Sequence, residues 1–243
     1  MADVTYAPLD IPKPLTDALW IVDSGPHKIA GMPLPVRMTV LRLPNGELIL
    51  HSPTRCRPEI RKALEALGPI GHLVAPNTVH WSYMPEWQQH YPQAVCWVVP
   101  GLGKRPAVAR SSLRIDRELA DGSPDLWQGQ IECVVVRGRL LSEAALFHRP
   151  SRSLVLTDLV VNVEREKLPL PLAIGARLVG STAPEGKAPA YTRLMMRLGG
   201  SRASEAARKL IALDPERVIF AHGRWFETDG AARLRRALAW LTS

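Results

Sequence analysis

Short apolar segments that alternate with helical stretches constrain the fold of this chain more than any other feature. Leu19–Val22 and Ile70–Ala75 have the length and composition of buried strands, and residues 58–67 have apolar side chains at helical spacing. The second half repeats this order. Strands are expected there at residues 130–136, 140–147, 154–158 and 217–221, with helices from about residue 168. The pattern predicts one α/β domain over residues 1–243.

A hairpin is predicted near the start of the chain. From Val36 to Leu43, apolar side chains alternate with Arg37 and Thr39, which is the period of a strand with one buried face. Pro44–Gly46 then provides a turn, and residues 47–50 form the returning strand. This pattern favours antiparallel pairing of the two segments.

The composition excludes several classes of protein. Hydrophobic residues make up 46% of the chain and charged residues 22%, without an apolar run of membrane-spanning length. Three cysteines, Cys56, Cys96 and Cys133, lie far apart and in no CxxC pair, which is typical of a reducing compartment. We therefore expect a cytoplasmic protein without a membrane partner. The sequence leaves its oligomeric state open.

The positive charge is concentrated towards the end of the chain. The formal net charge is +8, and the last 53 residues carry 10 basic side chains against 5 acidic ones. On the predicted C-terminal helices these basic side chains form either a solvated face or a nucleic-acid site. The arginines are dispersed, without interleaved aromatic residues, so we favour a solvated face and expect no nucleic-acid partner. Nucleic-acid binding through the Arg-rich helices is the second alternative function.

Polar residues follow four of the predicted strands, where α/β folds usually place their sites. Each of these residues also has a structural interpretation, such as a turn or a satisfied histidine, but their order along the chain carries more information. The four segments are His51–Thr54, Asn77–Tyr83, Thr157–Asp158 and His222–Gly223.

Two common catalytic classes lack their motifs. No Gly-x-Ser-x-Gly segment marks a nucleophilic serine, and Cys56 has only Arg55 and Arg57 as basic neighbours in the sequence. Gly101–Lys104 lacks the spacing of a phosphate-binding loop. A reactive thiol and a nucleotide site are therefore not expected.

The order of the four segments resembles the metallo-β-lactamase fold, a four-layer αββα sandwich with metal ligands on loops along one edge. The loop Asn77–Tyr83 stands where that family has His-x-His-x-Asp-His, and His51–Thr54 stands where it usually has Asp-x-Gly. Thr157–Asp158 is similar to its metal-bridging Gly-Asp step, and Ala221–Gly223 to its final His-Gly. The resemblance covers about residues 15–240.

A narrower resemblance is to the uncharacterised DUF4336 family. It rests on the loop Pro76–His80, on the helix end Glu86–Pro92, and on the strand pair from Phe147 to Asp158. Within the broader fold, this resemblance implies a chain whose metal motif is degenerate.

Most of the metal ligands of the larger family are replaced. If His80 matches the second His of the motif, Thr78, Ser82 and Tyr83 occupy the other ligand positions, and Arg139 stands where a further His occurs. Arginine is a permanent cation and would repel a second metal ion. The resemblance thus implies a site with fewer ligands than two zinc ions need. The metal-ligand types that remain are His80, Asp158 and His222.

The function that we favour from the sequence is a one-metal hydrolase of an ester, lactone or phosphoester. His₂-carboxylate ligands suit one zinc or iron ion, which activates a water. Ser82 and Tyr83 are the predicted catalytic residues. The predicted substrate-binding residues are Arg139, Trp81 and His51. The first alternative is a metal-free pseudoenzyme whose pocket binds a small anionic ligand, the partner that we expect in either case.

Overall fold

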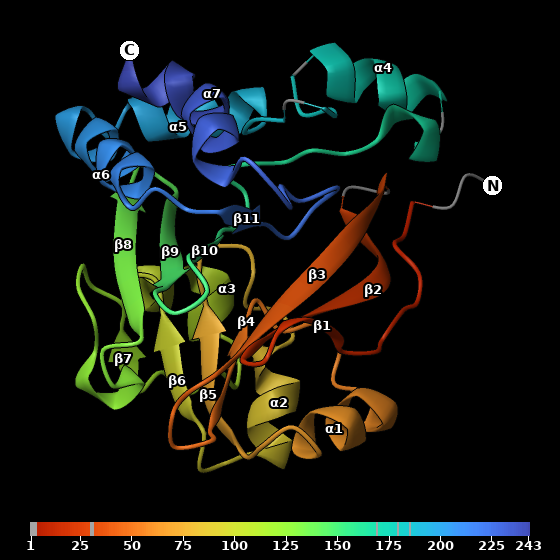
Figure 1. Ribbon diagram of the computed structural model, residues 1–243, viewed down its shortest axis with the longest axis vertical. Helices are drawn as coiled ribbons and strands as arrows, with labels where there is room; N and C mark the ends of the chain where they lie inside the picture. Colours follow the sequence, from red (N-terminus) through yellow and green to blue (C-terminus); the bar gives the residue numbers. More distant parts are fainter. Residues whose placement is uncertain (1–3, 30–31, 169, 179, 185) are drawn as a thin grey trace.

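Two facing sheets with helices on their outer sides form the body of the molecule (Figure 1). The computed structural model describes residues 4–29, 32–168, 170–178, 180–184 and 186–243. Within them the first sheet has the order β1 (Lys13–Thr16), β2 (Leu19–Ile29), β3 (Met32–Arg42), β4 (Leu48–His51), β5 (Ile70–Ala75), β6 (Val95–Val98) and β7 (Arg117–Glu118). The second has the order β11 (Arg217–Ile219), β10 (Ser153–Val155), β9 (Ser142–His148) and β8 (Ile131–Arg137).

The helices lie on both outer sides of the sheet pair, which confirms the expected αββα sandwich. On the first sheet these are α1 (Pro58–Glu65), α2 (Met84–His90) and the short α3 (Pro106–Ala109). On the second they are α5 (Ala190–Arg197), α6 (Ser201–Ala212) and α7 (Gly230–Thr242), with α4 (Leu170–Leu178) nearer the N-terminus. Single 3-10 turns occur at Leu102–Lys104, Asp125–Trp127 and Arg165–Lys167.

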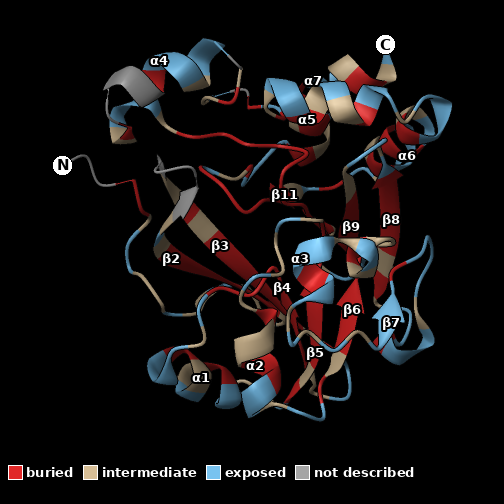
Figure 2. Cartoon of the chain, turned by 180° about the vertical axis from the view of Figure 1, so that it is seen from behind, coloured by how far each residue is buried: buried red, intermediate tan, exposed pale blue. Residues whose placement is uncertain are grey.

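The alternation of side chains along β8 shows how the layers are built. Ile131, Cys133 and Val135 pack into the core between the two sheets. Val134 and Val136 pack instead with α5, α6 and α7 on the other face. Successive strand residues point to opposite faces, so a strand that is apolar on both sides needs a layer on each side. In Figure 2 the strands are accordingly mostly buried, and the outer helix faces are exposed.

Parallel strands bring the predicted polar segments to one edge of the sandwich. β4 pairs in parallel with β5, so the residues after His51 and after Ala75 leave the sheet at the same end. In the second sheet β10 pairs in parallel with β11, with Val155 opposite Ile219. Asp158 and His222 thus follow neighbouring strand ends.

The predicted hairpin and first helix are confirmed, whereas some strands differ in length. β3 and β4 pair antiparallel around the turn at Gly46, whose φ of +88° suits glycine. β2 continues well beyond Val22 because it pairs with β3 across a bulge between Ser24 and His27. No helix in the described part of the chain combines the length and hydropathy needed to cross a bilayer.

Candidate metal centre

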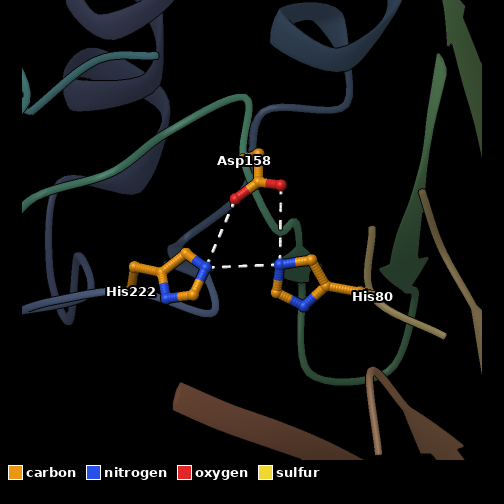
Figure 3. Close-up of side chains that lie close together, drawn as sticks. All are labelled: His80, Asp158 and His222. Atoms are coloured by element: carbon orange, nitrogen blue, oxygen red, sulfur yellow. Dashed lines mark hydrogen bonds and ion pairs between the residues drawn. The ribbon is translucent and has the colours of Figure 1, made fainter. Parts of the chain in front are cut away.

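Three side chains from distant parts of the chain converge at this edge (Figure 3). The Nε2 atoms of His80 and His222 lie 3.2 Å apart. The carboxylate of Asp158 faces both rings, with Oδ2 3.5 Å from His80 Nε2 and Oδ1 3.3 Å from His222 Nε2. One potential ligand atom from each residue therefore points into a common space.

The loop after β5 holds His80 through short polar side chains. The Oδ1 atom of Asn77 accepts hydrogen bonds from the backbone N–H groups of Val79 and His80, both at 2.8 Å. This arrangement is an Asx-type turn, which fixes the backbone locally. The Nδ1 atom of His80 lies 2.7 Å from the Ser52 hydroxyl, which comes from the loop after β4. Turn and hydroxyl together direct Nε2 towards Asp158.

The loop after β11 is held by the backbone and by a buried ion pair. His222 Nδ1 donates to the carbonyl oxygen of Pro35 at 2.7 Å. On either side of this histidine, the carbonyls of Phe220 and Gly223 accept hydrogen bonds from Arg37, both at 2.9 Å. The Arg37 guanidinium in turn lies 2.7 Å from Asp23. Two residues of β3, Pro35 and Arg37, thus fix the position of His222.

Asp158 is held by a third set of contacts. Its Oδ2 accepts a hydrogen bond from Asn77 Nδ2 at 2.7 Å. Below it, the fully buried Glu143 carboxylate accepts backbone N–H groups from Thr157, Asp158 and Leu159 at 2.6, 2.8 and 3.1 Å. Glu143 thus shapes the turn that presents Asp158.

The Asp158 carboxylate and the His222 imidazole each favour the charged form of the other. Burial opposes ionisation of Asp158, but His80 and hydrogen bonds from both histidines outweigh it and hold the pKa of this carboxyl below its usual range. Burial likewise lowers the pKa of His222, but Asp158 more than offsets this and raises it. Burial and the nearby Asp158 charge raise the pKa of Glu143 to about 7. A negative charge is therefore maintained between two imidazoles.

The spacing of these atoms fits one metal ion. Zinc bound tetrahedrally at about 2.0–2.1 Å separates its ligand atoms by about 3.3–3.4 Å. In the structure the two Nε2 atoms lie 3.2 Å apart, and each lies close to a different oxygen of Asp158, at 3.3 and 3.5 Å. With one ligand atom taken from each residue, all three atoms lie within 4.8 Å of one another. Metal-binding histidines usually have their second ring nitrogen bound by a protein group, as both are here by Ser52 and Pro35. His80, Asp158 and His222 can therefore hold zinc or a similar ion.

A cavity of about 320 Å³ opens beside these histidines. This volume lies at the lower end of the usual range of about 300–1,000 Å³ for small-molecule sites. Its lining includes both histidines, hydroxyl groups from two loops and a few apolar side chains. The lining residues are His27, Val36, Ser52, Pro53, Thr54, Val79, His80, Ser82, Tyr83 and His222.

The predicted catalytic and substrate-binding residues occupy different places. Ser82 and Tyr83 line the cavity. Trp81 packs against the core between the sheets, and His51 is buried, with burial lowering its pKa to about 3. Arg139 is exposed in the turn between β8 and β9 and does not line the cavity. The roles of all five side chains stay predictions.

Sequence reasoning missed three residues that support this site. His27 lies in none of the four polar segments, and the alternation of Arg37 with apolar residues predicts an exposed side chain. Arg37 is only 3% exposed because the loop after β11 covers it. Glu143 interrupts an otherwise apolar strand, and this signal could have identified it as a buried, bonded carboxylate.

The surroundings of Cys56 disfavour the reactive thiolate form. Burial, as the largest cause, raises its pKa to about 11. A thiol with that pKa is protonated at neutral pH, and the thiolate is the nucleophilic form. The expectation that this cysteine is not catalytic agrees with its surroundings.

The sequence matches one family model, described as Domain of unknown function (DUF4336), over residues 16–222. Among curated proteins, none matches it.

The fold is similar to solved metallo-beta-lactamases. The enzyme from Pontibacter korlensis has a TM-score of 0.64 and 14% identity, over 96% of this chain and 98% of that one. The metallo-beta-lactamase DIM-1, in a structure exposed to ceftazidime, has a TM-score of 0.67 and 12% identity, over 99% of this chain and 98% of that one. FIM-1 from Pseudomonas aeruginosa, in its mono-zinc form, has a TM-score of 0.61 and 13% identity, over 99% of this chain and 96% of that one. At such identities the likeness establishes the fold alone.

Proposed function

Because the chain belongs to the DUF4336 family and has a metallo-β-lactamase-like fold, we propose that it is a hydrolase that uses one metal ion. His80, Asp158 and His222 hold the ion, and the substrate is a small ester, lactone or phosphoester. The observation that carries this proposal is the convergence of the three side chains, whose ligand atoms, one from each residue, lie within 4.8 Å of one another. When bound, zinc or iron supplies an activated water and polarises the bond to be cleaved.

A single ion suits the residues better than a pair. The three side chains are the only group with metal-ligand spacing in the described part of the chain. Three protein ligands and one open position are the usual arrangement of catalytic zinc. The neighbouring positions Thr78 and Ser82 offer neither a carboxylate nor an imidazole.

Side chains around the cavity perform the remaining tasks. Ser82 and Tyr83 are hydrogen-bonding groups that can bind and orient the substrate. Asn77 keeps the Asp158 carboxylate in place, and Arg37 keeps the loop of His222 in place. The small volume of the cavity favours compact substrates and limits the water around the reacting bond.

Metal analysis of tag-free protein tests the proposal. We expect close to one equivalent of zinc or iron per chain by plasma mass spectrometry, lost on dialysis against chelator. His222→Ala should lose the ion, whereas His90→Ala, which changes an exposed histidine on α2, should keep it. Hydrolysis of an ester, lactone and phosphodiester panel should follow metal content across these proteins.

A metal content near zero, unchanged by added zinc, would contradict this function and favour the metal-free binding protein. The ion pairs that Asp158 already makes with both histidines support that alternative. In that case, small anions should stabilise the protein against heat equally with and without chelator.

The arginines near the C-terminus offer less support for nucleic-acid binding. Several of them bind groups of the chain itself, including Arg197 on the Trp240 carbonyl and Arg233 on the Pro184 carbonyl. If this face did bind nucleic acid, affinity for oligonucleotides would fall steeply with salt and with charge reversal at Arg235 and Arg236.

A further inference from the structure

The cavity beside the histidines has a second polar region, formed by His27, Thr54 and Tyr83. The Tyr83 hydroxyl lies 2.8 Å from His27 Nδ1, and the two rings meet edge to face with centroids 5.6 Å apart. His27 belongs to β2 and Tyr83 directly precedes α2, so two separate elements fix this hydroxyl in the wall. A fixed hydroxyl in a cavity is suited to binding a polar group of a ligand.

The Thr54 hydroxyl in the same wall is buried without a partner. Thr54 is 2% exposed, and its Oγ1 has no hydrogen bond to any residue that the structure describes. The backbone at this position is fixed, because the Thr54 carbonyl accepts a hydrogen bond from Trp87 Nε1 at 2.7 Å. A polar group that is buried without a partner destabilises the protein, and a hydrogen bond to a ligand oxygen would relieve this cost.

Arg55 gives this region a positive charge. Its guanidinium lies 5.9 Å from the centroid of the Tyr83 ring, and it forms no ion pair with any described residue. The nearby Arg57, in contrast, pairs with Asp10 at 3.5 Å. Among the described residues that line the cavity there is no carboxylate. Arg55 is exposed and does not itself line the cavity, but it directly follows Thr54 and lies over the ring of Tyr83, and both of these residues do. Its charge is therefore available to a ligand bound against them.

His27 contributes hydrogen bonding without adding a negative charge. Burial, as the largest cause, lowers its pKa, and the charges of His80, His222 and Arg55 lower it further. No acidic group is among these influences. With Arg55 over the Tyr83 ring and no carboxylate in the described cavity lining, the surroundings of the Tyr83 hydroxyl favour an anion over a cation.

We propose that Arg55, Thr54 and Tyr83 form a subsite for an anionic, oxygen-rich group of the substrate, either a carboxylate or a phosphate. The inference rests on the proposed hydrolase function for the cleaved bond, and it specifies that the substrate is a small ester that carries such a group. In hydrolysis, the water oxygen bonds to the acyl carbon, the bond to the leaving oxygen breaks, and that oxygen takes up a proton. The subsite binds the part of the molecule that does not react.

Two matched esters test the charge preference. p-Nitrophenyl hemiadipate carries a carboxylate that is too far from the ester for ready intramolecular attack, and p-nitrophenyl hexanoate is its uncharged match of equal chain length. Arg55→Gln should lower the ratio of their kcat/KM values by about tenfold, because the variant loses the charged donor that binds the carboxylate. Arg202→Gln makes the same charge change at an exposed position on α6 and should leave the ratio unchanged. A ratio that Arg55→Gln does not alter would overturn the subsite.

Binding to chelator-treated protein separates the two proposals. Succinate and inorganic phosphate, titrated separately by nuclear magnetic resonance, should each be tested against wild type, Arg55→Gln and Thr54→Val. We expect at least one of the two anions to bind the wild type, and both variants to bind it more weakly. The anion that binds more tightly shows whether the subsite prefers a carboxylate or a phosphate. If neither anion binds the wild type, the subsite is wrong. If binding is seen but loaded protein hydrolyses no ester, only the hydrolase function fails.

Discussion

The two halves of the sandwich hold their histidines by different means. His80, from the first half, is positioned by the side chains of Asn77 and Ser52. His222, from the second half, is positioned by the Pro35 carbonyl and by Arg37, which is part of a buried ion pair. The first arrangement is local and partly exposed, whereas the second depends on packing between β3 and the loop after β11.

This difference predicts which changes affect the whole fold and which affect only the site. Removing one member of a buried ion pair leaves a charge without a partner and destabilises a protein strongly. Removing a hydroxyl that orients one ring changes the ring's preferred direction but little else. Substitutions around His222 should therefore lower global stability, and those around His80 should lower metal affinity alone.

The largest effect is expected for Arg37→Met. The change leaves two carbonyls without their donor and leaves Asp23 with Lys13, 2.8 Å away, as its remaining charged partner. Breaking a buried pair costs about 3–5 kcal/mol, and because Lys13 remains we expect a loss near the lower end of this range. Urea unfolding of chelator-treated protein measures this loss. Arg42→Met provides the control, because Arg42 on the same strand is only partly buried and binds carbonyls without an ion pair to any described residue. A loss for Arg37→Met no larger than in the control would remove the contrast between the two halves.

A smaller effect is expected for His51, which lies on β4 next to Ser52. Burial lowers its pKa in the folded protein to about 3, so the unfolded chain binds a proton near pH 6.5 that the folded protein does not. Stability present above pH 6.5 is therefore lost as the pH falls towards 3, by at most about 1.4 kcal/mol per pH unit.

His51→Gln should flatten this dependence between pH 7 and pH 5. The measurement is the free energy of unfolding of both proteins in urea, without metal, at the two pH values. Parallel pH profiles for wild type and variant would show that His51 is not the group responsible.

The smallest effect is expected for Ser52→Ala. Loss of the hydroxyl that binds His80 Nδ1 should weaken metal binding about tenfold, the lower end of the range for such supporting groups, with little change in urea stability. Competition with a chelating dye measures the affinity. Ser82→Ala, in the same cavity but without a bond to either ring, is the matched control. A large loss of stability for Ser52→Ala would show that both halves are held in the same way.

Local patterns in the sequence predicted much of the fold. The turn at Gly46 and the Pro58 helix follow from rules that involve neighbouring residues only. The three ligand candidates were obtained from their order at strand ends and from the family resemblance. Their convergence depends on the pairing of β10 with β11, which no local pattern specifies.

The supporting residues were harder to predict because tertiary contacts reversed their local preference. Arg37 alternates with apolar neighbours as an exposed residue would, but a loop almost two hundred positions later covers it. His27 reaches the cavity because the bulge in β2 changes its register after Ser24. Both effects depend on segments that are distant in the sequence.

The bond from His222 to Pro35 joins residues 187 positions apart, and the bond from Asn77 to Asp158 spans 81. Contacts between residues so far apart in the sequence form late in folding, because the chain must first close long loops. The ligand set is therefore complete only after β11 has docked beside β10. Metal uptake by a refolding chain should report this last step, and a chain arrested before it would present His80 without its partners.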